Sequence, residues 1–361
     1  MSAAQLTEPY AGAEPDGATL RTAGYCEPGQ SRPDQGGPDW GGPETGGHGP
    51  EPEEPLPVLL SVVVPVLHEA PRIAALVGHV RALAGELPPG TVELVVADGA
   101  PEGDTLAALK TALGRDAWRA ATGLVAADLA PTSHLVTALA AEEFSGTGLP
   151  VRAVAAPRGR ARQMNAGAAV ARGQVLLFLH ADTRLPDGAF PAVLRALGVG
   201  GTGGAGGGEA RYADDAASCA ADGVPGAGAF TLSIDAPGAW FRVVETLGNL
   251  RNRLTRTPYG DQAQFFRAGV FRSLGGYPDL PLMEDVEIMR RLRRQHRQHC
   301  RHRADQPLAL LDLRAVTSAR RWRDEGAVRC TLRNVCLRLL YALGVPAQIL
   351  ARWYRARKGA S

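Results

Sequence analysis

The sequence LLSVVVPV, residues 59–66, is almost continuously apolar, as expected of a β-strand buried on both faces of a sheet. Pro71 follows a few residues later and suits the first turn of a helix, which we expect to end near Leu83. The sequence VELVVA, residues 92–97, predicts a second buried strand that ends at Asp98. Because buried strands that alternate with helices form parallel sheets, this stretch decides the fold class.

The same alternation continues along the chain. It predicts helices over residues 105–113, 159–172, 239–254 and 324–343, and strands over residues 151–155, 175–179 and 228–234. We therefore predict a Rossmann-like α/β fold, in which helices flank a mostly parallel mixed sheet and a helical extension follows at the C-terminus.

Composition divides the chain of 361 residues into a tail and a globular part. Residues 1–57 are rich in Gly, Pro and Glu and hold ten acidic residues and two Arg, a net charge of −8 against +2 for the whole chain. We predict that this acidic tail is disordered, that residues 58–323 form one domain, and that residues 324–361 are a basic, amphipathic helical segment. Two stretches look like insertions, an Ala-rich one at about 115–150 and a Gly-rich one at 198–210.

The cysteines and the apolar segments bear on location. Five cysteines show no metal-binding spacing, and their odd number, without the basic start and apolar core of a secretory signal, predicts a reducing cytoplasm. No apolar run reaches the ~18 residues that a membrane span requires. We therefore expect a cytoplasmic protein that is soluble or peripheral at the inner face of the cell membrane.

Four polar side chains directly follow predicted strands, namely Glu69, Asp98, Arg158 and Asp182. Ligands of parallel α/β sheets bind beyond the carboxyl ends of the strands, so we expect these side chains to share one site. A Glu-Asp pair, residues 284–285, opens a later helix and suits a base. Together these patterns predict transfer of a group from an activated donor that bears a diphosphate.

An ordered set of motifs resembles the family 2 glycosyltransferases, which have the GT-A fold. The set comprises SVVVP (61–65) with Glu69, ADG (97–99), GRARQMNAG (159–167), FLHADT (178–183), GDQ (260–262), GGYP (275–278), LMEDV (282–286) and SARRW (318–322). The resemblance covers about residues 58–345 and leaves out the tail and both insertions. The order of the motifs and their individual sequences resemble those of a bacterial subfamily. Members of this subfamily are of the kind linked to arsenosugar biosynthesis or to carotenoid glycosylation of the diaponeurosporenoate type.

The resemblance implies a binding site for a nucleotide-diphosphate sugar. In it, Asp98 contacts the base of the nucleotide, although an Asp-Gly pair at a strand end is also a common turn. The family usually continues with a Ser and a second Asp, where this chain has APEGDT (100–105), so the resemblance does not specify the nucleotide. The implied nucleotide-sugar contacts are Pro65, Glu69, Asp98, Arg158, Arg160, Gln163, Asn165, His180 and Asp261.

The resemblance also implies a divalent metal ion and a catalytic base. Asp182 is the implied ligand of Mg²⁺ or Mn²⁺, since such hard cations bind carboxylate oxygens and bridge a diphosphate. The usual pattern is Asp-any-Asp, and His180 takes the first place here, where it contacts the metal or the ribose or is structural. Asp285 is the implied base of an inverting transfer, with Glu284 as the second catalytic candidate. Acidic residues also favour helix N-termini, an explanation that suits Glu284 better than Asp285.

Arginines form two further candidate groups. Arg158, Arg160 and Arg162 flank a predicted helix start, which suits a diphosphate. Arg320, Arg321 and Trp322 resemble the Arg-Trp element that holds the diphosphate or the acceptor in processive relatives, while surface packing is an alternative for Trp322.

Residues 290–303 hold seven Arg and three His. Because no aromatic residues interleave them, we expect a solvated helix face and no nucleic-acid partner. Attraction to anionic lipid is a further interpretation, since the C-terminal helix is also basic and amphipathic, and it would suit a lipid acceptor.

The predicted activity is therefore transfer of a hexosyl group from a nucleotide-diphosphate sugar to a hydroxyl or carboxyl group of an unknown small-molecule or lipid acceptor. Two alternatives stay open. A sugar-nucleotide nucleotidyltransferase would place a Gly-rich loop with Lys or Arg after the first strand, where this chain has HEAP (68–71). A binding protein for nucleotide sugars or membrane surfaces, without catalysis, would not need Asp182 or the Glu-Asp pair.

Overall fold

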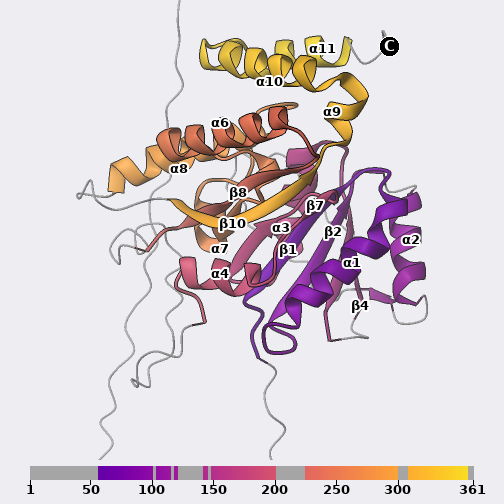
Figure 1. Ribbon diagram of the computed structural model, residues 1–361. Coiled ribbons are helices and arrows are strands. Elements are labelled where there is room, and N and C mark those ends of the chain that lie inside the picture. Colours follow the sequence, from indigo (N-terminus) through magenta and orange to yellow (C-terminus); the bar gives the residue numbers. More distant parts are fainter. Residues whose placement is uncertain are drawn as a thin grey trace, which may run out of the picture. The chain divides into compact units, whose positions relative to one another are not determined.

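The computed structural model describes residues 56–100, 103–114, 118–120, 141–144, 148–200, 224–299 and 308–356 (Figure 1). All of them belong to one compact unit, Glu54–Ser361. The predictions for the acidic tail, for most of the 115–150 insertion and for residues 201–210 fall outside these ranges.

The described strands form one ten-stranded mixed sheet. They are β1 (Leu60–Val66), β2 (Val92–Asp98), β3 (Trp118–Ala120), β4 (Ala141–Phe144), β5 (Val151–Ala155), β6 (Val175–Phe178), β7 (Thr183–Arg184), β8 (Ala227–Asp235), β9 (Phe265–Arg267) and β10 (Leu308–Ser318). Their order across the sheet is β3-β4-β5-β2-β1-β6-β9-β8-β10-β7. The longest ladders, β1 with β2 and β8 with β10, are parallel, and so are β5 with β2 and β6 with β1.

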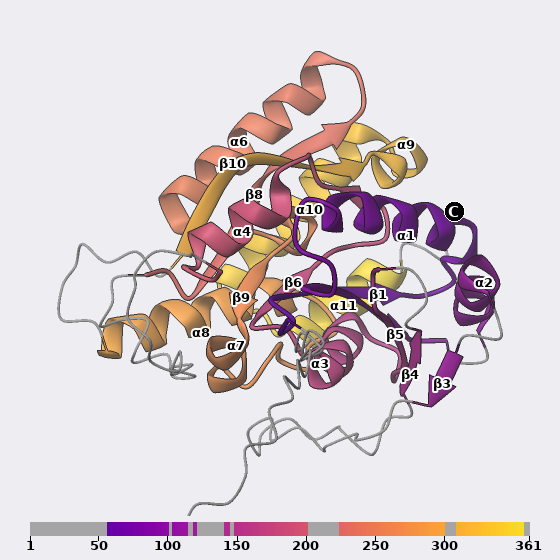
Figure 2. The same ribbon diagram turned by 90° about the horizontal axis from the view of Figure 1, so that it is seen from below.

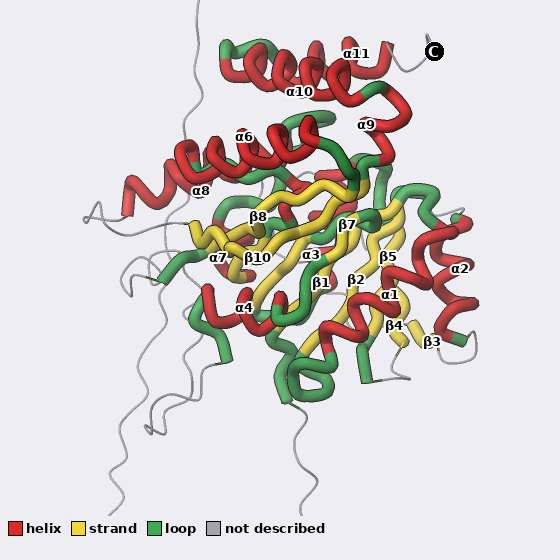
Figure 3. Tube along the Cα trace, in the orientation of Figure 1, coloured by secondary structure: helices red, strands yellow, loops and turns green. Residues whose placement is uncertain are grey.

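Helices cover both faces of this sheet (Figures 2 and 3). They are α1 (Ala70–Ala84), α2 (Asp104–Leu113), α3 (Arg160–Val170), α4 (Ala189–Ala196), α6 (Ala239–Thr255), α7 (Ala268–Ser273), α8 (Glu284–His299), α9 (Arg320–Glu325), α10 (Ala327–Ala342) and α11 (Ala347–Ala356), with a 3₁₀ turn η2 (Gly260–Gln262). One apolar core joins β1 and β2 to α1 and α4, and a second joins the opposite face of the same strands to α3, α7 and α8. The predicted α/β class, a mostly parallel mixed sheet flanked by helices, is confirmed.

The alternation of β1 side chains explains the two cores. Val62 and Val64 belong to the core under α1, and Val63 between them belongs to the core under α3. A continuous apolar run is needed because both faces are covered. Helix α3 lies so close that a Cβ added at Gly167 would come 2.5 Å from the Val63 side chain.

Two sequence predictions differ from the structure. The helix expected over residues 324–343 is α10, but it begins at Ala327, because Gly326, whose φ of 86° lies in a region that favours glycine, separates it from the short helix α9. Part of the expected 115–150 insertion belongs to the sheet, because β4 pairs antiparallel with β5 and β3 pairs with β4. An ion pair between Arg152 on β5 and Glu143 on β4 supports this edge.

Candidate active site

The carboxyl ends of β5, β2, β1 and β6 share one edge of the sheet, because these neighbouring strands are parallel. Asp98 ends β2 there and is fully buried. Its Oδ1 accepts a hydrogen bond from the Ala100 N–H at 2.9 Å, and its Oδ2 has no hydrogen-bond partner among the described residues. Burial raises the pKa of Asp98. A buried oxygen with spare acceptor capacity fits the predicted contact with a donor base.

The C-terminal part of the chain reaches the same edge. Glu69, just past β1, forms an ion pair with Arg72 and lies 3.7 Å from the Arg320 guanidinium at the start of α9. The adjacent His68 has a φ of 55°, an uncommon conformation for a residue other than glycine. Two predicted site residues from distant segments, Glu69 and Arg320, are thus brought together.

Gln163 and Asn165, both predicted to contact the donor, use their amides on the backbone of the protein. The Gln163 amide donates to the carbonyl oxygens of Val66 and Ala97, at the ends of β1 and β2. The Asn165 amide donates to the Tyr277 carbonyl at 2.8 Å and accepts from the Tyr277 N–H at 2.9 Å. These contacts favour positioning roles for both residues.

The other two residues of this region that were predicted to contact the donor are Arg158 and Pro65. Arg158 is exposed between β5 and α3, and Pro65 is half-buried in β1. Neither side chain contacts the acidic residues described next.

The predicted Glu-Asp pair opens helix α8, as expected. The preceding residue, Met283, has a φ of 69°, and its carbonyl accepts a hydrogen bond from the Glu287 N–H at 3.1 Å. Asp285 Oδ2 accepts from the Gly260 N–H at 2.8 Å, and its Oδ1 accepts from the Val286 N–H at 2.7 Å. Backbone groups from two separate segments therefore fix the Asp285 carboxylate, and the strained residue before the helix aims it.

Two further carboxyl groups surround Asp285. Asp261 lies in η2, its Oδ1 is buried without a partner among the described residues, and burial and Asp285 raise its pKa to about 6. Glu284 is 6% exposed, and its pKa is raised by burial and by Asp285, against the opposing effect of Arg160, whose Nη1 lies 3.8 Å away. Like charges in one desolvated site drive protons onto some of its members. Here Asp261 and Glu284 are the carboxyl groups that keep a proton, because their pKa values are raised.

His180 joins this acidic cluster from the end of β6. A Cβ added at Gly260 would lie 3.2 Å from His180 Nε2 and 3.7 Å from Asp285 Oδ2, so the glycine lets both side chains approach the η2 turn. The Nε2 atom is buried without a partner among the described residues. Burial, with Arg160 and Arg321 nearby, lowers the pKa of His180 well below its usual value. The imidazole is therefore neutral and can act as an acceptor or a ligand.

Asp182 lies two residues beyond His180 and is half-buried. Its backbone carbonyl accepts from the Ser318 N–H at 3.1 Å, which ties it to the end of β10, while its carboxylate makes no hydrogen bond or ion pair within the described ranges. No group of three or more His, Cys, Asp and Glu side chains in the described part of the chain could hold a metal ion alone. A free carboxylate and a neutral imidazole fit a divalent ion only if a bound diphosphate supplies further oxygens.

Arg321 and Trp322 of the SARRW segment make different kinds of contact. Arg321 is exposed and acts electrostatically on both His180 and Asp261. The Trp322 ring packs edge-on against Phe241 of α6, with ring centroids 6.4 Å apart. This contact favours the packing alternative for Trp322.

Sequence reasoning missed the support beneath the cluster. The guanidinium groups of Arg251 and Arg338 both contact the Tyr259 ring, 3.5 and 4.6 Å from its centroid. The Tyr277 hydroxyl donates to Gln264 at 2.8 Å, and the Gln264 amide in turn donates to the Asp285 carbonyl at 3.4 Å. The GDQ and GGYP motifs lie beside these residues in the sequence. The contacts themselves join segments that are far apart in the chain, so no short sequence motif could have predicted them.

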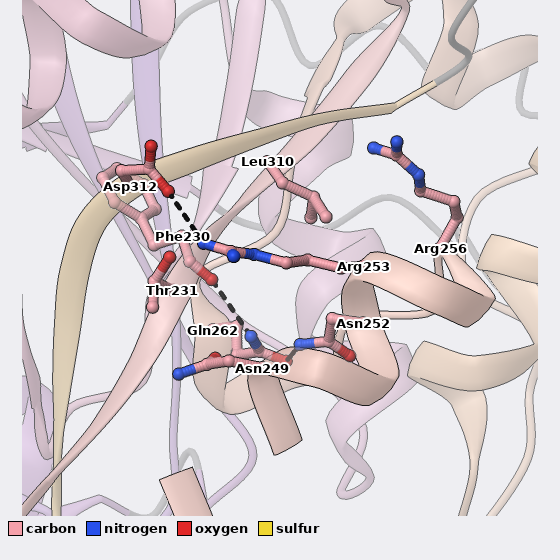
Figure 4. A pocket seen from close by; sticks show the side chains of 9 residues that line it. All are labelled: Phe230, Thr231, Asn249, Asn252, Arg253, Arg256, Gln262, Leu310 and Asp312. Carbon is pink, nitrogen blue, oxygen red and sulfur yellow. Dashed lines mark hydrogen bonds and ion pairs between the residues drawn. The ribbon is translucent and has the colours of Figure 1, made fainter. Parts of the chain in front are cut away.

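A cavity of about 290 Å³ lies between α6, β8 and β10 (Figure 4). The Gln262 amide donates to the Phe230 carbonyl at 3.0 Å there, and Arg253 pairs with Asp312 at 3.4 Å. None of the predicted site residues lines it, although Gln262, next to Asp261 in the η2 turn, does. Its lining residues are Phe230, Thr231, Asn249, Asn252, Arg253, Arg256, Gln262, Leu310 and Asp312.

Comparison with known proteins adds one sequence match. Residues 133–225 match the model of the family described as "Glycosyl transferase family 2". This segment includes β5, α3 and β6, and with them Arg160, His180 and Asp182. No curated protein matches the chain.

Solved structures that are similar to the chain include three that represent different proteins. They are the mannosyltransferase PcManGT from Pyrobaculum calidifontis in complex with GDP-Man and Mn²⁺ (15% identity, TM-score 0.41, 74% of this chain and 60% of that chain), S. aureus TarS 1-349 in complex with UDP (12%, 0.42, 72% and 60%), and glucosyl-3-phosphoglycerate synthase from Mycobacterium tuberculosis in complex with Mn²⁺, UDP and phosphoglyceric acid (16%, 0.41, 80% and 80%). The chain spans about three fifths of the length of the first two.

Proposed function

We propose that this chain is a family 2 glycosyltransferase of the GT-A fold that moves a hexosyl group from a nucleotide-diphosphate sugar to a hydroxyl or carboxyl acceptor. The observation that carries the proposal is the cluster of Asp261, Glu284 and Asp285 beside a neutral His180 at the carboxyl edge of the sheet. The family match over residues 133–225 supports it, because that segment supplies the basic and metal-binding candidates of the same edge.

Asp285 is the proposed base of an inverting transfer. The acceptor oxygen forms a bond to the anomeric carbon on the face opposite the diphosphate, which leaves with the electron pair of the broken bond. The Asp285 carboxylate takes the acceptor proton as this bond forms. Asp285 suits this role because the N–H groups of Gly260 and Val286 fix its two oxygens, so the carboxylate is already oriented when the acceptor binds. Burial raises the pKa of Asp261 and of Glu284, so these two groups lose their protons only at higher pH than ordinary carboxyl groups do.

The donor is proposed to lie along the carboxyl edge, with its base at Asp98. Arg160, at the start of α3, and Arg321 face the site and would balance the charge of the diphosphate. Asp182 would hold Mg²⁺ or Mn²⁺ together with diphosphate oxygens, and the bound ion would neutralise charge that develops on the leaving group.

The finer assignments follow the sequence resemblance. We propose membership in the bacterial subfamily linked to arsenosugar or carotenoid glycosylation, a small-molecule or lipid acceptor, and a cytoplasmic location that includes peripheral contact with the inner face of the cell membrane.

The test is donor turnover by the full chain. UDP-, GDP- and TDP-hexoses are supplied with Mn²⁺ or Mg²⁺, and release of the nucleoside diphosphate is measured with water as the acceptor. We expect release from one nucleotide class and a loss of roughly 10²-fold or more in Asp285→Asn, the usual contribution of a general base. Asp187→Asn, at an exposed aspartate before α4, is the matched control and should keep the wild-type rate. Wild-type turnover by a folded Asp285→Asn protein would show that the base is another group.

A further inference from the structure

Three helices carry an unusual exposed surface. Except for Leu56, every exposed large hydrophobic side chain in the described ranges belongs to α6, α10, the C-terminal end of α10 or α11, with exposed fractions from 39% to 81%. Isolated exposed apolar residues are normal, but a contiguous set marks an interaction site. The set, here called the apolar stripes, consists of Trp240, Val243, Leu247, Leu250, Leu254, Val328, Leu332, Val335, Leu339, Leu343, Ile349 and Trp353.

The spacing of these residues places them on single helix faces. Steps of three and four residues separate the members on α6 and, equally, those on α10, so each helix presents one stripe. The residues that α6 buries, Glu245 and Asn252, and those that α10 buries, Cys330 and Leu337, fall at other positions of the helical turn. The stripes are therefore not the faces that hold these helices on the protein.

The two helices lie next to each other. Arg251 of α6 and Arg338 of α10 both contact the Tyr259 ring, and the Tyr341 hydroxyl of α10 donates a hydrogen bond to Glu287 of α8. Helices α10 and α11 lie farther from the sheet than α6 and α8 (Figure 1). The stripes thus lie at two levels above the sheet, one on α6 and the others on α10 and α11, and both levels contact Tyr259, which directly precedes the η2 turn of the acidic cluster.

Charge distinguishes these three helices from an ordinary protein interface. Together α6, α10 and α11 contain eight Arg and a single acidic residue, Glu245. Glu245 is buried, pairs with Arg242 at 2.8 Å and accepts from the Ile234 N–H. Other arginines are also engaged, because Arg253 pairs with Asp312, Arg333 pairs with Glu325, and Arg251 and Arg338 lie over the Tyr259 ring. Arg329 of α10 and Arg352 of α11 are exposed, so positive charge flanks the stripes of these two helices.

We propose that the apolar stripes are a docking surface for an anionic lipid bilayer. A bilayer interface accepts apolar side chains, and its anionic headgroups attract arginines that lie near the surface. Trp240 and Trp353 suit the headgroup level, where tryptophan is favoured. Docking would be peripheral, because none of the described helices is long and apolar enough to cross a membrane.

A second copy of the chain is the disfavoured occupant. A two-fold interface would place the same arginine-rich face on both sides, and like charges oppose that contact. The proposed function includes peripheral contact with a membrane, and the docking proposal rests on it and names the surface that makes this contact. Lipid binding needs no sugar transfer, so failure of one proposal does not imply failure of the other.

The experiment is co-sedimentation of the full chain with vesicles of phosphatidylcholine and phosphatidylglycerol, against vesicles of phosphatidylcholine alone. The paired variants are Leu332→Glu, in the α10 stripe, and Leu56→Glu, outside it, at side chains that are 57% and 56% exposed. We expect binding to the anionic vesicles that weakens with salt, a loss of about tenfold or more in Leu332→Glu, and no loss in Leu56→Glu. Arg329→Glu should weaken binding, and Arg195→Glu, at an exposed arginine of α4, should not.

Three results would overturn the proposal. The first is no binding of the folded protein to anionic vesicles, and the second is equal binding by Leu332→Glu and Leu56→Glu. The third is a stable dimer in size-exclusion chromatography that only Leu332→Glu dissociates, since the stripes would then cover each other. Far-UV circular dichroism confirms that each variant is folded before the comparison.

Discussion

Replacing Asp261 by Asn should stabilise the folded protein at neutral pH and cost it activity. Burial and Asp285 raise the pKa of Asp261 from 3.8 to about 6. The folded chain therefore keeps this proton over a pH range in which the unfolded chain has lost it. The sign follows from this difference, since stability must fall as pH rises from about 4 to about 6 and stay lower above that range.

The magnitude comes from the same two values. The difference between 3.8 and about 6, at 1.36 kcal/mol per pKa unit, corresponds to an upper limit of about 3 kcal/mol. Asn fills a similar volume and never ionises, so the variant avoids this cost. In a domain of this size, each kcal/mol shifts the melting temperature by roughly 2 °C, and we expect Asp261→Asn to melt about 2–6 °C higher above pH 7.

The assay is thermal unfolding followed by circular dichroism at about pH 4 and about pH 7.5. Wild type and Asp261→Asn should differ at the higher pH and converge at the lower one. Asp235→Asn, at an exposed aspartate that ends β8, serves as the control and should match wild type at both. A lower melting temperature for Asp261→Asn at pH 7.5, or an equal difference at both pH values, would refute the reasoning.

Three shorter predictions concern neighbouring features. Gly167→Ala should destabilise the protein by about 1–3 kcal/mol in urea unfolding, because the new Cβ would lie 2.5 Å from Val63, and an unchanged midpoint would contradict this packing. Asn165→Ala should cost about 2 kcal/mol in the same assay and lower turnover, because Tyr277 loses two backbone hydrogen bonds; stability equal to wild type would mean that the amide contacts are not needed. Asp182→Asn should raise the Mn²⁺ concentration required for half-maximal turnover at least tenfold at unchanged stability, and an unaltered Mn²⁺ response would remove Asp182 from the metal site.

Much of the fold could be predicted because the sequence of each central strand is an almost continuous apolar run. Strands such as β1 and β2 are buried on both faces. Their apolar runs therefore predict a buried strand even when the strands that pair with them are unknown. Short strands at the edges, such as β4, carry no such run and depend on pairing with β5. The predicted helix over 324–343 begins slightly before α10, because its helical pattern runs through Gly326, whose backbone conformation separates α9 from α10.

The site was predictable in position more than in detail. Residues at the carboxyl ends of adjacent parallel strands must share an edge, and that rule placed Asp98 and Glu69 together. The hydrogen bond from the Gly260 N–H to Asp285 joins residues far apart in sequence, and only the folded chain reveals it. For Gln163, a polar residue in a binding motif suggested a ligand contact, whereas its amide satisfies two carbonyl groups of the sheet.

The most direct measurement is the melting temperature of the full chain with UDP, GDP and TDP, each with and without Mn²⁺. A ligand at about 100 times its Kd stabilises the folded state by about 2.7 kcal/mol, which corresponds to roughly 5 °C for a chain of this size. The proposed donor site predicts a rise of that order for one nucleoside diphosphate, dependent on Mn²⁺ and lost in Asp182→Asn. No rise with any of the three, in a protein that unfolds cooperatively, would contradict a nucleotide-sugar site at this edge of the sheet.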